Sequence, residues 1–459
     1  MNSNNASRRE FLKRASALSV LGGATPFALN LAAIGSAAAD TSDNRALVCL
    51  FLYGGNDQTN TVIPYDQASY DAYNAARSTI ARARTDLLEI VPTNTPAGRG
   101  FALPPELAPI KTLFDSGKAA VLANVGPLVA PVKDANEYKS GKAQLPPKLF
   151  SHNDQQATWQ AFSPEGARLG WGGRLGDLFA SQNANTTFTA ISAAGNAVFL
   201  SGQTTIQYQI STSGAIPING LSGTLFGSPA GTAALRSVIT KNSSQLFEKE
   251  HAAVVQRSID AQMAVSAALA NIPATDARVA LDTSVAANGL AKQLQIVARL
   301  IASAPALGAR RQVFFVSLGG FDTHDDQLVN QPKLHDTLAR AVSYFYNATA
   351  ALGVADKVTL FTGSDFGRTL TSNGDGSDHG WGSHHFIVGG AVKGQAIYGN
   401  FPEIRLGTAE DLGSGRLLPG TSVDQYAATL ARWFGVADSD LPLVAPNIGR
   451  FATTDIGFL

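Results

Sequence analysis

The chain has 459 residues, of which 45% are hydrophobic and 15% charged, with 44 glycines and 21 prolines. This composition excludes a disordered chain, a coiled coil and a collagen-like protein, and it allows a large buried core. The 35 basic and 35 acidic side chains give a formal net charge of zero, which argues against nucleic acid as a partner. The single cysteine, Cys49, lies in an apolar run and is predicted to be a buried thiol.

Residues 1–39 have the pattern of a cleaved twin-arginine export signal. The paired arginines Arg8 and Arg9 precede a moderately apolar stretch from Ala15 to Ile34, and three alanines follow at 37–39. Glycine, proline and asparagine within the stretch make it a poor membrane span. We therefore expect a periplasmic or secreted protein with no stable membrane insertion after the signal is removed.

Five apolar runs of the remaining chain are each followed by glycine, which is typical of strands buried on both faces of a sheet. They cover residues 45–53, 119–125, 312–318, 357–362 and 385–388. Helical patterns lie between them, for example at 290–301 and 425–434. This alternation predicts an α/β fold with a mostly parallel sheet flanked by helices, and a ligand site beyond the carboxyl ends of the strands.

Residues 40–459 are predicted to form one such domain with two further regions. Residues 185–235 are rich in Ser, Thr, Gly and Asn and contain short alternating stretches, so a β-rich insertion is expected there. Residues 236–310 are expected to be mainly helical, with long helices at 243–272 and 285–303.

Two polar clusters lie in the first half of the domain. Asp57 closes the sequence Gly-Gly-Asn-Asp after the first strand, which suits either a tight turn or a functional carboxylate. Ser151 and His152 head a predicted helix. The serine either caps the helix or presents its hydroxyl at the positive helix end, where an anionic substrate would bind.

Two more clusters follow later strands. Residues 319–327 place three carboxylates and His324 within five positions, beginning at Asp322, which favours a metal site over a hydrogen-bonded turn. Mixed oxygen and nitrogen ligands suit zinc or manganese better than calcium. The last cluster contains Asp365 and Arg368 after one strand, and His379 and His384 before the next. Carboxylates and imidazoles at strand ends are what metal-dependent hydrolysis requires.

Signatures of other common chemistries are missing from the sequence. It contains no G-x-G-x-x-G after a strand, no phosphate-binding loop with lysine, no C-x-x-C and no H-E-x-x-H. A G-x-S-x-G elbow is also missing, although a serine hydrolase is compatible with the residue types. His251 and His335 lie away from the clusters on predicted helices and are expected to be ordinary surface or core histidines.

Taken together, these motifs resemble the exported domain-of-unknown-function family numbered 1501, over nearly the whole mature chain. The resemblance rests on the signal, on the Asp57 and Ser151 clusters, and on the segments Gly-Phe-Asp-Thr-His at 320–324, Ser-Asp-Phe-Gly-Arg at 364–368, Asp-His-Gly-Trp-Gly at 378–382 and Gly-Arg-Leu-Leu-Pro at 415–419. That family resembles the alkaline phosphatase and sulfatase superfamily, whose members hydrolyse phosphate or sulfate esters at a one-metal or two-metal site on an α/β sheet.

The resemblance implies roles for individual residues. The metal ligands would be Asp57, Asp322, His324, Asp365 and either His379 or His384, holding one or two divalent ions, with zinc favoured. Ser151 would be the nucleophile, with His152 beside it, and Arg368 would balance charge on the transferring group. Phe366 departs from the superfamily pattern, because it stands where histidine or asparagine is common, and this departure argues against a complete second metal site. The sequence also lacks C-x-P-x-R, which disfavours a formylglycine sulfatase.

The expected function is that of an exported metal-dependent hydrolase of phosphate or sulfate esters, using a hydroxyl nucleophile on a small or polymer-borne anionic ester. A non-catalytic binding or accessory protein on a degenerate scaffold is the main alternative, and Phe366 favours it. A metal-free serine hydrolase is a third. Neither the substrate nor the oligomeric state can be inferred from the sequence.

Overall fold

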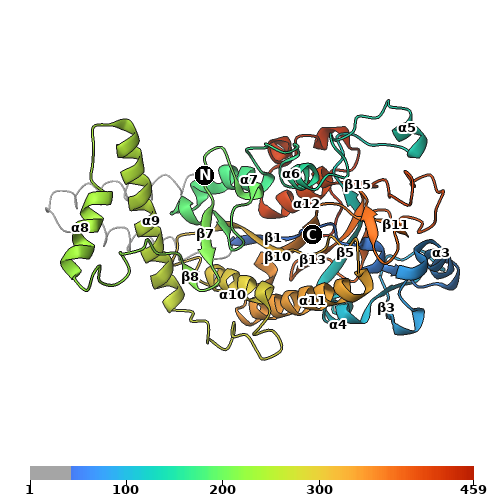
Figure 1. Cartoon of the computed structure of the whole chain (residues 1–459), viewed down its shortest axis with the longest axis horizontal. Helices are drawn as coiled ribbons and strands as arrows, with labels where there is room; N and C mark the ends of the chain where they lie inside the picture. Colours follow the sequence, from blue (N-terminus) through green and yellow to red (C-terminus); the bar gives the residue numbers. More distant parts are fainter. Residues whose placement is uncertain (1–42) are drawn as a thin grey trace, which may run out of the picture.

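A mixed ten-stranded sheet forms the centre of the molecule in the computed structural model, which describes residues 43–459. The predicted signal at 1–39 lies outside these residues. The strand order is β14-β5-β13-β10-β1-β9-β6-β7-β8, with β15 beside β5 (Figure 1). The strands are β1 (Arg45–Leu52), β5 (Ala119–Gly126), β6 (Ala190–Ser192), β7 (Tyr208–Ser211), β8 (Gly214–Ala215), β9 (Arg311–Leu318), β10 (Val358–Ser364), β13 (Ser383–Gly389), β14 (Ile397–Tyr398) and β15 (Thr421–Ser422).

Most of these strands run in one direction. β1 pairs in parallel with β9 and β10, β6 pairs in parallel with β9 and β7, and β14 and β15 pair in parallel with β5. β13 runs antiparallel to both β10 and β5, and β8 runs antiparallel to β7. The five strands predicted from the apolar runs are all present, and the prediction of a mostly parallel α/β sheet is confirmed.

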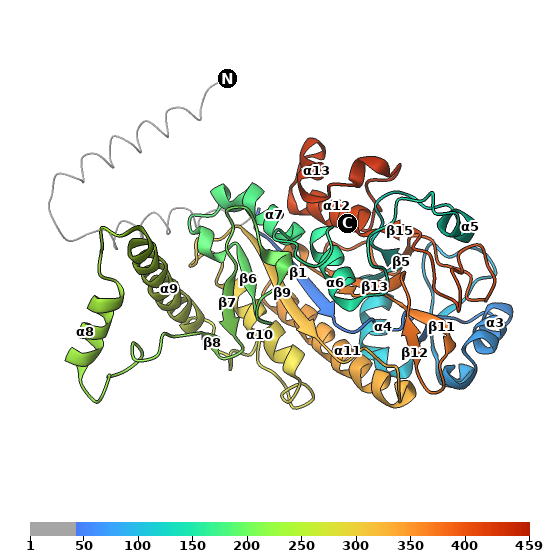
Figure 2. The ribbon, with the colours of Figure 1, turned by 45° about the horizontal axis from the view of Figure 1, so that its top comes forward.

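Helices cover both faces of the sheet because side chains of β1 alternate between two cores. Val48 and Leu50 face one core and Cys49 and Phe51 the other. The first core includes α4 (Ala108–Asp115), α10 (Gly289–Ala302) and α11 (Gln327–Ala351). The second includes α6 (His152–Ala161), α7 (Trp171–Phe179), α12 (Val423–Phe434) and α13 (Leu441–Val444), on the opposite side of the sheet (Figures 1 and 2).

The region 185–310 combines sheet extension with a projecting pair of helices. β6 and β7 join the edge of the main sheet, so they extend it. α8 (Pro229–Ile239) and α9 (Leu246–Ala270) then project from the end of the sheet (Figure 2), and α8 has no buried residue. The main helices within 236–310 are therefore α9 and α10.

Smaller elements flank the other end of the sheet. A three-stranded sheet consists of β2 (Ile63–Pro64), β4 (Phe101–Leu103) and β3 (Leu88–Ile90), next to α3 (Gln67–Arg77), and α5 (Ala135–Lys139) lies apart from it. A separate hairpin pairs β11 (Arg368–Ser372) with β12 (Ser377–His379).

Cys49 and His335 are buried and His251 is exposed, as predicted. Within residues 43–459, no helix has the length and apolar character needed to cross a membrane.

Candidate metal centre

The register of three parallel strands brings the predicted site residues to one edge of the sheet. Leu52 at the end of β1 is paired with Ser364 of β10 on one side and with Leu318 of β9 on the other. The chain that follows each strand therefore emerges at the same level. Asp322 lies four residues beyond β9 and Asp365 comes directly after β10.

Gly54 allows these segments to approach one another closely. Its φ is +114°, and a Cβ added there would lie 2.3 Å from the backbone nitrogen of Asp322. The Gly54 N–H donates to Asp365 Oδ1 at 3.1 Å. At Gly55 an added Cβ would lie 2.4 Å from the Phe366 ring. The two glycines after β1 therefore serve close packing around the site.

Replacing Gly54 with alanine is expected to lower the free energy of unfolding by about 3 kcal/mol or more, because the new Cβ meets backbone as well as an unfavourable φ. Gly98→Ala is the matched control, since Gly98 has φ +81° but faces open space. Gly98→Ala should lower the free energy of unfolding by only about 1 kcal/mol. Urea unfolding of the two variants measures the difference, and equal losses would contradict the close approach.

His152, Asp322 and His379 form a group whose ligand atoms all lie within 4.8 Å of one another. His152 Nε2 is 3.3 Å from Asp322 Oδ2, and His379 Nε2 is 3.3 Å from Asp322 Oδ1. Ligands 2.0–2.1 Å from a tetrahedral zinc ion are separated by about 3.3 Å. The three side chains therefore fit a divalent cation.

Asp365 orients His152. The imidazole Nδ1 lies 2.6 Å from Asp365 Oδ2. Because a carboxylate only accepts hydrogen bonds, Nδ1 is the donor and Nε2 is turned toward Asp322. This hydrogen bond raises the pKa of His152 against the effect of its partial burial, and the charges of Asp365 and Asp322 add to it. Asp365 is fully buried and also accepts from Gln156 Nε2 at 2.7 Å, so it holds the histidine in place.

A backbone carbonyl orients His379. The Phe150 oxygen accepts a hydrogen bond from His379 Nδ1 at 2.8 Å. Phe150 has a left-handed φ of +69°, an uncommon conformation for a non-glycine residue. Burial lowers the pKa of His379, and the nearby charges of His152 and Arg368 act in the same direction. At neutral pH the ring is therefore neutral, with the Nε2 lone pair facing Asp322.

His324 brings a further imidazole to the group. Its Nε2 lies 2.9 Å from His379 Nε2 and 3.2 Å from Asp322 Oδ1, and its Nδ1 is 3.3 Å from Asp378 Oδ1. A carboxylate on the outer nitrogen is the same arrangement that Asp365 makes with His152. His324 thus contacts two members of the group, Asp322 and His379, and lies beside the three residues whose ligand atoms share one cluster.

Arg368 forms an ion pair with Asp322. Its guanidinium is fully buried and donates to Asp322 Oδ1 at 2.8 Å and to the Ser377 oxygen at 2.7 Å. Partial burial raises the pKa of Asp322, but the hydrogen bond and charge of Arg368, with the charges of His152 and His324, outweigh it and hold that pKa below its usual value. Asp322 is therefore ionised at neutral pH. The predicted role of Arg368 on a transferring group needs access that this buried position does not provide.

Phe366 packs against both histidines, whose rings also contact each other with centroids 4.4 Å apart. Its ring centroid lies 4.8 Å from that of His152 and 4.5 Å from that of His379. The side chain is fully buried. It therefore provides an apolar wall for the imidazoles and no ligand.

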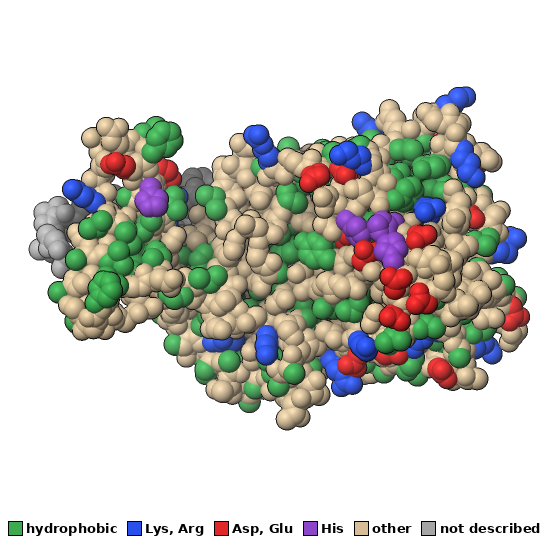
Figure 3. Space-filling model, viewed as in Figure 1, with side chains coloured by type: hydrophobic (Ala, Val, Ile, Leu, Met, Phe, Trp, Pro, Cys, Tyr) green, Lys and Arg blue, Asp and Glu red, His purple; other side chains and the backbone are tan. Residues whose placement is uncertain are grey.

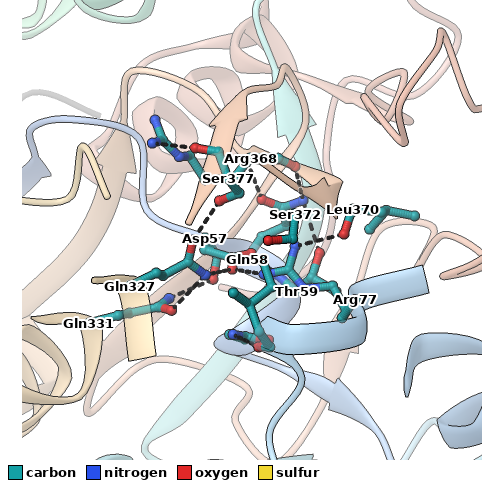
Figure 4. Close-up of polar contacts among 12 residues, drawn as sticks. Asp57, Gln58, Thr59, Arg77, Gln327, Gln331, Arg368, Leu370, Ser372 and Ser377 are labelled. Atoms are coloured by element: carbon teal, nitrogen blue, oxygen red, sulfur yellow. Dashed lines mark hydrogen bonds and ion pairs between the residues drawn. The ribbon is translucent and has the colours of Figure 1, made fainter. Parts of the chain in front are cut away.

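Asp57 lies in a buried network that reaches Arg368 through Gln327 and Ser377, as Figure 4 shows. Its carboxylate forms an ion pair with Arg77 and accepts hydrogen bonds from Gln327 and from the Thr59 N–H. All of these side chains are buried. Asp57 therefore neutralises Arg77, and the structure does not bring it into the group around Asp322.

Ser151 and His384 also lie outside the group. Ser151 takes the N-cap position of α6 without a side-chain bond to the helix backbone, and its hydroxyl donates to Asp154 Oδ2 at 2.9 Å. His384 is buried, its Nδ1 accepts from the Asn124 N–H at 3.0 Å, and burial lowers its pKa to about 3. Of the predicted residues, the structure thus gathers His152, Asp322, His324, Asp365, Arg368 and His379.

The centre opens to solvent on one face of the molecule. The His152 side chain is 28% exposed, His379 23% and Asp322 43%. Figure 3 shows the histidines together on this face, with acidic side chains around them. The sequence identified Asp365 as a candidate ligand rather than as the partner of His152. The orienting contact of Phe150 could not be identified from sequence, because a carbonyl contact leaves no residue-type signal.

The fold and the site define an α/β protein with a candidate metal centre at the carboxyl edge of its sheet. The chain belongs to the family described as "Protein of unknown function (DUF1501)", which matches residues 44–444 and confirms the resemblance. No curated protein matches the sequence.

Solved structures that are similar to this chain include two of Ps i-CgsB. The complex of Ps i-CgsB with k-i-k-neocarrahexaose is 9% identical, with 90% of this chain and 77% of that chain covered and a TM-score of 0.36. A second crystal structure of Ps i-CgsB is 10% identical, with 89% and 77% covered and a TM-score of 0.33.

Proposed function

We propose that this chain is exported by the twin-arginine route and hydrolyses phosphate or sulfate esters with one divalent cation. The observation that carries the proposal is the convergence of His152, Asp322 and His379, with both imidazoles held by hydrogen bonds at Nδ1. The ester class rests on the resemblance of the motifs to the alkaline phosphatase and sulfatase superfamily.

The proposed ligands are these three residues, which would leave a further coordination position for the ester. Imidazole nitrogens with a carboxylate oxygen favour zinc, and His324, which contacts Asp322 and His379, is a candidate further donor. A divalent ion supplies Lewis-acid polarisation of the ester. Asp365 and Phe150 keep the Nδ1 protons in place, and Arg368 keeps Asp322 ionised. A single ion is proposed, because Asp57 pairs with Arg77 and His384 faces Asn124.

Ser151 is the proposed nucleophile. It directly precedes His152, and its hydroxyl already donates to the buried carboxylate of Asp154. Ser151→Ala should abolish hydrolysis while zinc binding persists. Full activity in this variant would indicate that water, and not Ser151, is the nucleophile.

A binding protein on the same scaffold is the second candidate, and the Phe366 ring favours it. This ring packs against both imidazoles with apolar surface where the superfamily commonly places a ligand. Such a protein would use the cation to hold an anionic ligand without turnover.

The test uses the mature chain, purified from the exported fraction without a histidine tag. Elemental analysis should find one equivalent of zinc or a similar metal. A panel of phosphate monoesters, phosphate diesters and sulfate esters should show hydrolysis that is lost on chelation and restored by the metal. Metal without turnover would favour the binding protein, and a folded chain that takes up no metal would overturn both.

A further inference from the structure

Arg416 borders the candidate metal centre without an acidic partner. Its Nε donates to the His379 oxygen at 2.9 Å, and its guanidinium carbon lies 5.3 Å from the centroid of the Phe150 ring. Phe150 is the residue whose carbonyl orients His379. Within residues 43–459 no carboxylate forms an ion pair with Arg416, and its Nη groups make no hydrogen bond there. The guanidinium is thus anchored through Nε, and its outer edge can meet a ligand.

A tight loop fixes the position of Arg416. Asp411 Oδ1 accepts hydrogen bonds from the N–H groups of Gly413 and Gly415, each at 2.8 Å. Gly415 has φ +72°, and a Cβ there would lie 2.3 Å from the Cβ of Leu370 in β11. The loop is therefore seated on the hairpin that carries His379, so Arg416 moves with the centre.

The other arginines near the centre have their charges occupied. Arg368 is buried against Asp322, and Arg77 is buried against Asp57. Among these arginines, Arg416 is therefore the one whose charge is available to an anion that enters the site from solvent. A guanidinium stacked on a ring and held through Nε presents two Nη groups, which suit the oxygens of a phosphoryl or sulfuryl group.

Acidic side chains near the centre limit how much negative charge a ligand can carry. Asp325, Asp326 and Asp375 are exposed and form no ion pair in the described part of the chain. Figure 3 shows acidic side chains beside the histidines on this face. The repulsion by these three carboxylates and the attraction by Arg416 both grow in proportion to ligand charge. Because the carboxylates outnumber the guanidinium, a second ligand charge adds more repulsion than attraction from these four groups.

We propose that Arg416 binds an anionic oxygen of the ester substrate, and that the acidic rim (Asp325, Asp326 and Asp375) selects singly charged esters. Sulfate monoesters and phosphate diesters share this single charge, whereas phosphate monoesters carry two charges above neutral pH. This inference rests on the proposed function, because it takes the centre to hold a cation.

The test measures ligand binding to the zinc-loaded chain by calorimetry at about pH 8.5. Methyl phenylphosphonate carries one charge there and phenylphosphonate two, so the pair differs in charge on one scaffold. The wild-type chain should bind the singly charged probe more tightly. Arg416→Gln should weaken that binding by about tenfold or more, because a charged hydrogen bond is lost. The double variant Asp325→Asn, Asp375→Asn should bind phenylphosphonate more tightly than the wild-type chain does.

Arg84→Gln is the matched control, because Arg84 stacks on Tyr65 at 4.5 Å and donates to its carbonyl, in a separate part of the fold. It should leave both affinities unchanged. Zinc content of each variant reports whether the centre is intact, and Arg416→Lys, which keeps the charge, should bind the probe with intermediate affinity.

An Arg416→Gln chain that retains its zinc and binds methyl phenylphosphonate as tightly as wild type would overturn the role of Arg416, while the proposed function would stand. If the wild-type chain bound phenylphosphonate more tightly than methyl phenylphosphonate, the proposed selection for a single charge would be overturned. Failure of the proposed function has a different signature, because the wild-type chain would then take up no zinc, or would take up zinc and hydrolyse no ester of the panel. To separate the ester classes, p-nitrophenyl sulfate and bis(p-nitrophenyl) phosphate are compared by kcat/KM.

Discussion

Asp322→Asn is expected to weaken zinc binding by at least about a hundredfold and to lower ester hydrolysis by about a thousandfold or more. The carboxylate lies within 3.3 Å of the Nε2 atoms of His152, His324 and His379, so it is the one carboxylate that all three imidazoles approach. Asparagine keeps the shape and removes the charge. Competition titration with a zinc chelator measures the first effect, and turnover on the best ester of the panel measures the second.

Asp378→Asn is the matched control for this variant. Asp378 approaches His324 at its outer nitrogen, 3.3 Å away, and belongs to no proposed ligand set. Loss of such an outer carboxylate should weaken zinc binding by about tenfold. If Asp322→Asn retained wild-type zinc affinity, the cation would have to be held elsewhere.

Acidification from about pH 7.5 to pH 5 is expected to remove about 6 kcal/mol of stability through three buried histidines. His335, His384 and His385 are almost completely buried, and burial lowers the pKa of each to about 3. In the unfolded chain these rings take up protons near pH 6.5, whereas in the folded chain they stay neutral until about pH 3. Stability is therefore fully present above pH 6.5 and is lost as the pH falls, by about 2 kcal/mol for each ring at pH 5.

Urea unfolding at several pH values tests this expectation, with His384→Gln compared with wild type. In His384→Gln, the loss of unfolding free energy between pH 7.5 and pH 5 should be smaller by about one third, whatever the stability of the variant at pH 7.5. His251→Gln removes an exposed histidine and should leave the pH dependence unchanged. An identical pH dependence for His384→Gln and wild type would mean that His384 is protonated in the folded chain.

The sequence by itself determined the sheet and the region of the site. Continuous apolar runs are recognisable because a strand buried on both faces needs apolar side chains at every position, and this pattern is local. The segments carrying Asp322 and Asp365 followed from it, because parallel strands deliver their carboxyl ends to one edge. His379 precedes β13, and it reaches the same edge because β13 runs antiparallel to β10. The family could also be recognised, since its motifs are short segments of adjacent residues.

Only the tertiary structure decided which of these side chains meet. Asp57 and Asp322 look equivalent in sequence, but Arg77 of α3 occupies the first carboxylate, whereas the second faces three imidazoles. Asp365 had the residue type of a ligand and became the partner of His152, more than two hundred positions away. Such roles depend on how closely segments that are remote in sequence approach one another. They also depend on backbone groups such as the Phe150 carbonyl, which carry no residue-type signal.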